Sequence, residues 1–147
     1  MKRLAPLALV ALIMSVSIMA CSSKTVQRDM SQMPESAQNI VNTNFKSKVA
    51  SVETETNVIG ATEYEVRLAD GTEIQFLNEE WDEVSVPAGQ SVPEYFVIEP
   101  IRTFVTQNQP GVVIVSIDRK NNGFEVELSN GIDIKFDTAG NFIKYDH

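Results

Sequence analysis

Few side chains in this sequence could perform catalysis. It contains one cysteine, Cys21, and one histidine, His147, which is its last residue. Nucleophilic catalysis by serine or cysteine needs a base beside the nucleophile, and a terminal histidine is poorly placed to act as one. The sequence also lacks a glycine-rich phosphate loop and a cysteine–histidine set suited to zinc. We therefore expect no catalytic residues, no metal site, no cofactor and no enzymatic activity.

Cys21 follows a segment typical of a bacterial signal peptide. Two basic residues precede an apolar run over residues 4–19, which is too short and too weakly apolar for a good transmembrane helix. The run ends in Ile18-Met19-Ala20-Cys21, which resembles a lipobox. This resemblance implies that residues 1–20 are a cleaved lipoprotein signal peptide and that Cys21 is lipidated. The alternative is an ordinary secretory signal with an incidental cysteine.

The residues after Cys21 bear on where the protein is held. Acylation with two or more chains gives stable membrane anchoring. The residue after Cys21 is Ser22 and not aspartate, which by similarity to known sorting rules favours the outer membrane, facing the periplasm. Residues 21–32 are polar and aperiodic, so we expect a lipidated flexible tether of roughly 20 Å. Contact with the membrane is expected through the lipid anchor only.

The mature chain is strongly acidic. The whole sequence has 12 basic and 20 acidic residues, and removal of two basic residues with the leader changes the net charge from −8 to −10. Such a charge repels nucleic acid, so no nucleic-acid partner is expected. Ten acidic residues and a single basic one, Arg67, fall within residues 50–90. Residues 78–83 could bind calcium loosely, but they lack the spacing of an EF-hand.

An internal duplication sets the architecture. Residues 64–76 match residues 124–136 at a constant offset of 60, so that apolar, turn and acidic positions coincide. Upstream, Met33-Pro34-Glu35 matches Val92-Pro93-Glu94 at an offset of 59. We therefore expect two tandem repeats, over residues 33–88 and 89–147.

Each repeat opens with a helical pattern. Residues 34–48 carry an apolar stripe at helical spacing, made of Ala37, Ile40, Val41 and Phe45. In the second repeat the stripe consists of Ile101, Phe104 and Val105, but Pro100 would interrupt a helix that began at Pro93. Either that helix is kinked, or its regular part begins near Pro100.

Both matched segments alternate apolar and polar residues with a period of two, which predicts a β-hairpin in each repeat. Val66 and Ile74 share the apolar face only if they are directly opposed, which requires a loop with an odd number of residues. We therefore predict a three-residue loop at residues 69–71, with Gly71 in the left-handed conformation as a G1 bulge. The second repeat predicts the same loop at residues 129–131.

Further strands are expected near residues 50–56, 80–85, 112–118 and 141–146. Each repeat is then α-β-β-β-β, and the predicted fold is α+β, with both helices packed on one face of an antiparallel sheet. Trp81 and Phe142 occupy equivalent positions and are expected to seal the ends of the core.

The same register assigns side chains to the uncovered face. In the first repeat these are Glu53, Glu55, Glu63, Glu65, Arg67, Glu73 and Gln75, and in the second Ile114, Glu125, Glu127, Asp133 and Lys135. Glu127 is expected opposite Asp133, an unfavourable pair of like charges. Two interpretations stay open: the face receives a basic protein or peptide, or its long side chains simply splay into solvent.

The hairpin residues carry a family resemblance. Tyr64-Glu65-Val66, Gly71, Phe76 and Trp81, followed by Phe124-Glu125-Val126, Gly131, Phe136-Asp137 and Gly140-Asn141-Phe142, resemble the PepSY-like proteins described as β-lactamase-inhibitor-like (BLIP-like). The resemblance covers about residues 33–147. It implies a helix-backed antiparallel sheet in a small secreted or lipid-anchored protein without catalysis. Likeness to an inhibitor is likeness of fold and does not establish inhibition.

Two functional hypotheses follow. The leading one is a non-enzymatic cell-envelope lipoprotein that acts as a binding or inhibitory module for a protein or peptide through the acidic face of its sheet. The alternative is a structural or stress-related envelope protein with no defined ligand.

Overall fold

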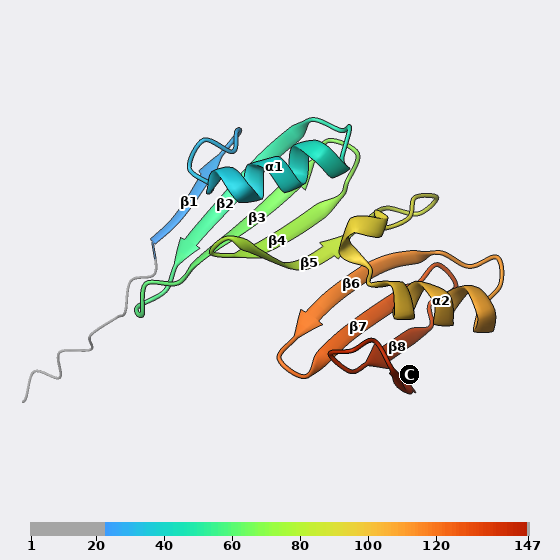
Figure 1. Cartoon of the computed structure of the whole chain (residues 1–147). Coiled ribbons are helices and arrows are strands. Elements are labelled where there is room, and N and C mark those ends of the chain that lie inside the picture. Colours follow the sequence, from blue (N-terminus) through green and yellow to red (C-terminus); the bar gives the residue numbers. More distant parts are fainter. Residues whose placement is uncertain (1–22, 147) are drawn as a thin grey trace, which may run out of the picture.

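The computed structural model describes residues 23–146, so the predicted signal peptide, Cys21 and His147 lie outside the described residues (Figure 1). Its helices are α1 (Glu35–Asn44), a short 3₁₀ helix η1 (Glu94–Phe96) and α2 (Glu99–Asn108). Its strands are β1 (Ser23–Gln27), β2 (Val49–Thr56), β3 (Thr62–Leu68), β4 (Glu73–Leu77), β5 (Glu80–Ser85), β6 (Ile114–Lys120), β7 (Gly123–Leu128), β8 (Asp133–Phe136) and β9 (Phe142–Asp146).

All nine strands form one antiparallel sheet, and their order in the sheet is their order in the chain. The α+β class with an antiparallel sheet is therefore confirmed. Helix α1 lies across the early strands and α2 across the later ones, both on the same side of the sheet (Figure 1). The opposite side of the sheet carries no helix of the described chain.

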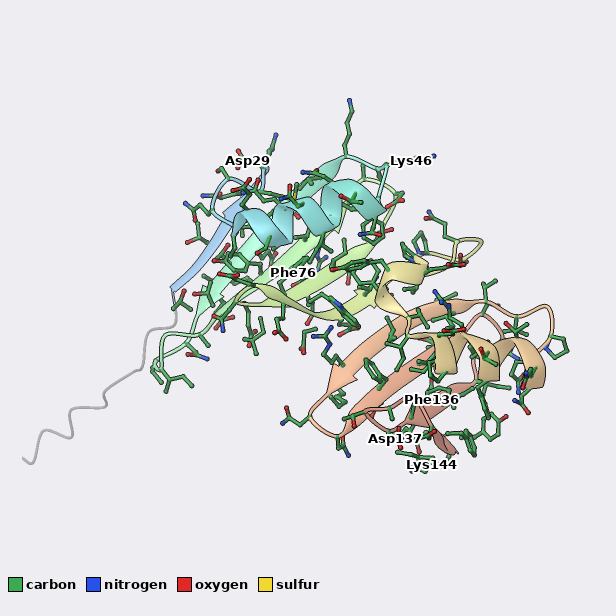
Figure 2. The ribbon with its side chains drawn as sticks, in the orientation of Figure 1. Asp29, Lys46, Phe76, Phe136, Asp137 and Lys144 are labelled. Carbon is green, nitrogen blue, oxygen red and sulfur yellow. The ribbon has the colours of Figure 1, made fainter. Side chains whose placement is uncertain are left out.

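The core lies between the helices and the sheet. Val66 and Val126 are at most 1 % exposed, as the predicted orientation of the two hairpins requires. Phe76 and Phe136, one on each half of the sheet, are equally buried and are labelled in Figure 2. Burial of such apolar side chains is the main favourable term in folding, since the sole cysteine excludes an intrachain disulfide.

The predicted hairpin loops are confirmed. In the first, the Leu68 N–H donates to the Thr72 carbonyl, which closes a three-residue loop, and Gly71 has φ +94°. In the second, the Leu128 N–H donates to the Ile132 carbonyl, and Gly131 has φ +79°. Val66 pairs with Ile74 and Val126 with Ile134, so both hairpins have the expected register.

The helices are shorter than the pattern predicts. Helix α1 ends at Asn44 and not near Lys48, because Phe45 is already extended (φ −126°) and the chain must turn there to enter β2. In the second half a separate 3₁₀ turn follows Pro93, and the regular helix begins at Glu99, with Pro100 in its first turn. Proline is tolerated there because the first-turn N–H groups have no intrahelical acceptor. The second of the two alternatives is therefore correct.

The prediction of a flexible tether over residues 21–32 is wrong for residues 23–27. These residues form β1, which pairs with β2 from Ser23↔Thr56 to Gln27↔Val52. The five-residue segment is polar and short, so its sequence carries little strand signal. It is ordered because β2 offers an unpaired edge of backbone N–H and C=O groups. No helix within the described residues is long and apolar enough to cross a bilayer.

Two further predictions are corrected by the structure. Ile114, expected on the uncovered face, is 8 % exposed. A bulge between Ile114 and Ser116 inserts Val115, so that Ile114 pairs with Leu128 and turns toward the core. Trp81 is buried, as expected, but Phe142 is 40 % exposed, because it lies on the edge strand β9.

Candidate functional site: the open face of the sheet

The open face of the sheet presents continuous rows of side chains. One row crosses all nine strands through directly paired residues: Val26, Glu53, Glu65, Gln75, Glu83, Asp118, Glu125, Lys135 and Lys144. A parallel row crosses eight strands: Ser51, Arg67, Glu73, Ser85, Ser116, Glu127, Asp133 and Asp146. The alternation of buried apolar and outward polar residues produces these rows.

We call the charged part of this surface the acidic face. It consists of the predicted residues Glu53, Glu55, Glu63, Glu65, Arg67, Glu73, Glu125, Glu127, Asp133 and Lys135, with Glu83 and Asp118 added by the structure. The ten predicted residues lie on β2, β3, β4, β7 and β8, and the registers place them on one side of the sheet. Pairing of β5 with β6 joins the two halves through Glu83↔Asp118.

Glu83 and Asp118 were missed because sequence reasoning left the partner of each outer strand open. A usable signal existed. Val84 and Ile117 are fully buried, and alternation then places Glu83 and Asp118 on the opposite side. The alternation predicts the face on which each side chain lies, but it does not predict which two strands pair.

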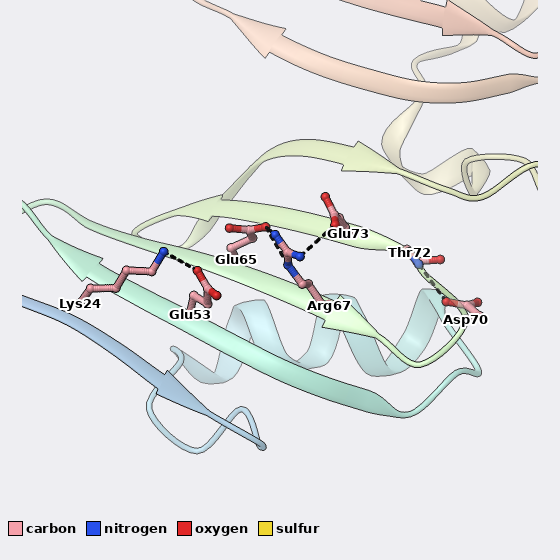
Figure 3. Close-up of polar contacts among 7 residues, drawn as sticks. All are labelled: Lys24, Glu53, Glu65, Arg67, Asp70, Thr72 and Glu73. Atoms are coloured by element: carbon pink, nitrogen blue, oxygen red, sulfur yellow. Dashed lines mark hydrogen bonds and ion pairs between the residues drawn. The ribbon is translucent and has the colours of Figure 1, made fainter.

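Basic side chains neutralise only part of the acidic face. Arg67 lies between two carboxylates, 2.6 Å from Glu65 and 3.6 Å from Glu73, and the Lys24 ammonium is 2.6 Å from Glu53. Figure 3 shows these contacts on the open side, with α1 behind the strands. The two carboxylates around Arg67 raise its pKa, and the Lys24 ammonium lowers the pKa of Glu53.

In the second half, Lys135 forms ion pairs with two carboxylates. The Lys135 ammonium is 2.7 Å from Asp146 and 3.0 Å from Glu125, and both contacts raise the pKa of Lys135, that of Asp146 the more. Within residues 23–146, a further set of outward carboxylates forms no ion pair: Glu55, Glu63, Glu83, Glu127 and Asp133.

Like charges oppose each other repeatedly across the strands. The carboxylate residues that are register partners on neighbouring strands are Glu53↔Glu65, Glu55↔Glu63, Glu83↔Asp118, Asp118↔Glu125, Glu127↔Asp133 and Asp133↔Asp146. Directly opposed like charges destabilise a sheet by about 0.2–1 kcal/mol each. The predicted opposition of Glu127 and Asp133 is thus confirmed, and it is one of several.

Glu83 is a carboxyl of the acidic face whose pKa lies above its ordinary value. Partial burial raises the pKa of Glu83, and the facing Asp118 carboxylate raises it further. Lys120 acts in the opposite direction, but its ammonium is already paired with Asp118. A positive group brought near Glu83 would therefore stabilise its charged form.

The surface beside Glu83 and Asp118 is hollowed. A shallow depression of about 190 Å³ is lined by Glu83 and Asp118 together with Ser116, Glu125, Val126, Glu127, Asp133, Ile134, Lys135 and Asp146. Its walls offer mainly carboxylate oxygens, which accept hydrogen bonds from ammonium and guanidinium groups. Within residues 23–146 no three histidine, cysteine or acidic side chains are arranged to hold a metal ion.

Comparison with protein families assigns the chain. Residues 62–144 match the model of the family "Putative beta-lactamase-inhibitor-like, PepSY-like". This chain belongs to that family. The PepSY-like match runs from the start of β3 into β9 and therefore includes both predicted hairpins. No curated protein matches the chain.

Solved structures match most of the PepSY-like chain. One is described as a "putative periplasmic protein of unknown function" from Bacteroides vulgatus; it is 33 % identical, with a TM-score of 0.79 over 85 % of this chain and 100 % of the other. A "putative calcium-regulated periplasmic protein" from Bacteroides thetaiotaomicron is 32 % identical, with a TM-score of 0.77 over 84 % of this chain and 97 % of its own.

A third structure, a "putative periplasmic protein" of the DUF2874 family from Bacteroides vulgatus, is 32 % identical, with a TM-score of 0.76 over 84 % of this chain and 97 % of the other. The PepSY-like chain thus resembles proteins described as periplasmic, which is consistent with a place in the cell envelope.

Proposed function

We propose that this chain is a non-enzymatic envelope lipoprotein that binds a basic protein or peptide on its acidic face. The observation that carries the proposal is the repeated opposition of carboxylates across the central strands. A solubilising surface would gain stability from alternating charges. A surface that receives cations instead keeps its carboxylates unpaired until the partner arrives.

The chemistry of the depression indicates what the partner presents. Lysine or arginine side chains would replace water at Glu83, Glu127 and Asp133 and form charge-assisted hydrogen bonds there. Because these sites are partly exposed, binding should depend strongly on ionic strength. The proposed partner therefore presents a basic segment of a protein or peptide, and the proposal includes inhibition of that partner by binding.

The same proposal includes the architecture and the anchor. We infer two tandem α-β-β-β-β repeats, residues 33–88 and 89–147, because the hairpin registers recur at the offset of 60 found in the sequence. We also infer a signal peptide over residues 1–20 and lipidation of Cys21, with attachment to the outer membrane facing the periplasm. The lipobox-like sequence and the periplasmic relatives support this placement.

Glu127→Lys tests the binding surface. Cells that express the full chain are crosslinked, and the proteins captured with the lipoprotein are identified and quantified by mass spectrometry. We expect Glu127→Lys to reduce capture of a basic partner at least about tenfold, by loss of attraction and introduction of repulsion. The same change should raise stability by roughly 0.5 kcal/mol, because it turns the Glu127–Asp133 opposition into a favourable pair.

Glu79→Lys is the matched control. It makes the same change of net charge at an exposed residue of the β4–β5 turn, outside the acidic face. Capture should persist in this variant. Equal loss of capture in both variants would show that the overall charge of the protein, and not the acidic face, causes the effect. Unchanged capture in Glu127→Lys would exclude the acidic face as the binding surface.

A further inference from the structure

The tip of the β2–β3 hairpin exposes two adjacent apolar side chains. Val58 is 79 % and Ile59 85 % exposed, and the segment from Thr56 to Thr62 contains no charged residue. Single exposed apolar residues are common on proteins and need no explanation. Two adjacent exposed apolar residues on an uncharged hairpin tip are less common, and the position of this tip in the fold indicates a role for them.

The tip has a defined conformation. The Asn57 side-chain oxygen accepts hydrogen bonds from the N–H groups of Ile59 (3.1 Å) and Ala61 (3.0 Å), and the Asn57 N–H donates to the Ala61 carbonyl (2.9 Å). Gly60 supplies the positive φ of +87° that the reversal needs. These bonds define the course of the loop backbone, and the Val58 and Ile59 side chains are exposed.

The start of β1 lies at this same end of the sheet. Ser23 is the register partner of Thr56, the last residue before the tip, and Figure 1 shows the beginning of β1 beside the loop that joins β2 to β3. Cys21 is only two residues before Ser23, so a fully extended chain separates their Cα atoms by at most about 7 Å. The order of β1 thus replaces the expected long tether by a very short one.

We propose that Val58 and Ile59 insert into the lipid surface beside the acylated Cys21, so that the protein contacts its membrane by two points. This inference rests on the proposed lipidation of Cys21. Acyl chains entering the bilayer bring the hairpin tip to the headgroup region, where apolar side chains are stabilised and charged ones are not. The strands then stand away from the membrane, and the acidic face remains accessible to a partner.

The test uses the absence of any other cysteine. In the mature lipoprotein the Cys21 sulfur is a thioether, so Ile59→Cys introduces a single reactive thiol that accepts an environment-sensitive fluorophore. The labelled protein is reconstituted in vesicles of phosphatidylethanolamine and phosphatidylglycerol that carry lipid-borne quenchers. Lys46→Cys, on the exposed loop between α1 and β2 at the far end of α1, is the matched control (Figure 2).

We expect the probe at position 59 to be blue-shifted and quenched at least about twofold more than the probe at position 46. Adding Val58→Asp to the Ile59→Cys protein should abolish this difference, while the circular dichroism stays unchanged because the loop is exposed. Equal quenching at both positions in a protein whose acylation is verified by mass spectrometry would overturn the inference alone. An unacylated mature N-terminus would overturn the lipid anchor and this inference with it.

Discussion

At the scale of single residues, Glu83 shows how an unpaired carboxylate affects stability. It lies in mid-sheet, between its register partners Gln75 on β4 and Asp118 on β6. Partial burial and then the nearby carboxylates of Asp118, Asp82 and Glu73 raise its pKa, and the Lys120 ammonium acts in the opposite direction. Its pKa is raised above the usual value, so the folded state favours the protonated form. The stability that protonation provides is complete below the ordinary glutamate pKa and is lost as the pH rises through the raised one.

Glu83→Gln should therefore stabilise the protein near neutral pH and have no effect in acid. We expect a gain of about 0.5 kcal/mol at pH 7, reduced by solvent screening, that disappears near pH 4. Urea unfolding at several pH values, followed by circular dichroism, measures this gain. Glu79→Gln, which removes the same charge from an exposed residue of the β4–β5 turn, outside the acidic face, is the control. A pH-independent gain from Glu83→Gln would show that burial of Glu83 is not the cause.

At the scale of the elements, two glycines separate conformational strain from direct steric exclusion. Gly131 has a positive φ, but a Cβ there would meet nothing within 4 Å. Gly123 begins β7, where a Cβ would lie 1.9 Å from the Phe136 carbonyl oxygen and 2.9 Å from the Asp137 Cα. Backbone atoms of β8 cannot move aside as a flexible side chain can.

Gly131→Ala should cost about 1 kcal/mol of unfolding free energy, the usual penalty for alanine at a left-handed position. Gly123→Ala should cost roughly 3 kcal/mol or more, because the β7–β8 pair must separate locally. Thermal unfolding by calorimetry compares the two variants. Similar losses in both would mean that β7 can shift to accommodate the added methyl group.

At the scale of the whole molecule, the two halves meet at Phe96. This residue is 1 % exposed, and its ring contacts Phe45 near the end of α1 (5.7 Å between centroids) and Trp81 on β5 (5.4 Å). It belongs to the 3₁₀ helix η1 that precedes α2, so it ties the second half of the chain to the first. Only three residue pairs join β5 to β6, which makes this aromatic contact a substantial part of the junction.

Phe96→Ala should cost about 3–5 kcal/mol, as for other large buried aromatics. It should also separate unfolding of the two halves, so that Trp81 fluorescence and circular dichroism no longer change together in urea. Tyr95→Ala is the control, since Tyr95 is 58 % exposed and its loss should cost far less. Coincident transitions in Phe96→Ala would show that the continuous sheet alone couples the halves.

Local periodicity in the sequence is sufficient to predict much of this fold. Odd loop length, a period of two and a glycine at the third loop position were enough to predict both hairpins and the side of the sheet on which each predicted glutamate lies. Ile114 is buried instead, because the bulge at Val115 inserts one extra residue and shifts the alternation by one position, which a period-two pattern does not predict.

The pairing of strands that are distant in the sequence is not predictable from periodicity and is seen only in the folded chain. Pairing of β5 with β6 brings Glu83 opposite Asp118, and pairing of the polar segment 23–27 with β2 places the start of the described chain beside Val58 and Ile59. Strand edges offer the same backbone N–H and C=O groups whatever their sequence, so the choice among partners depends on the packing of the whole core. The centre of the acidic face and the position of the β2–β3 tip beside the start of the described chain both depend on that choice.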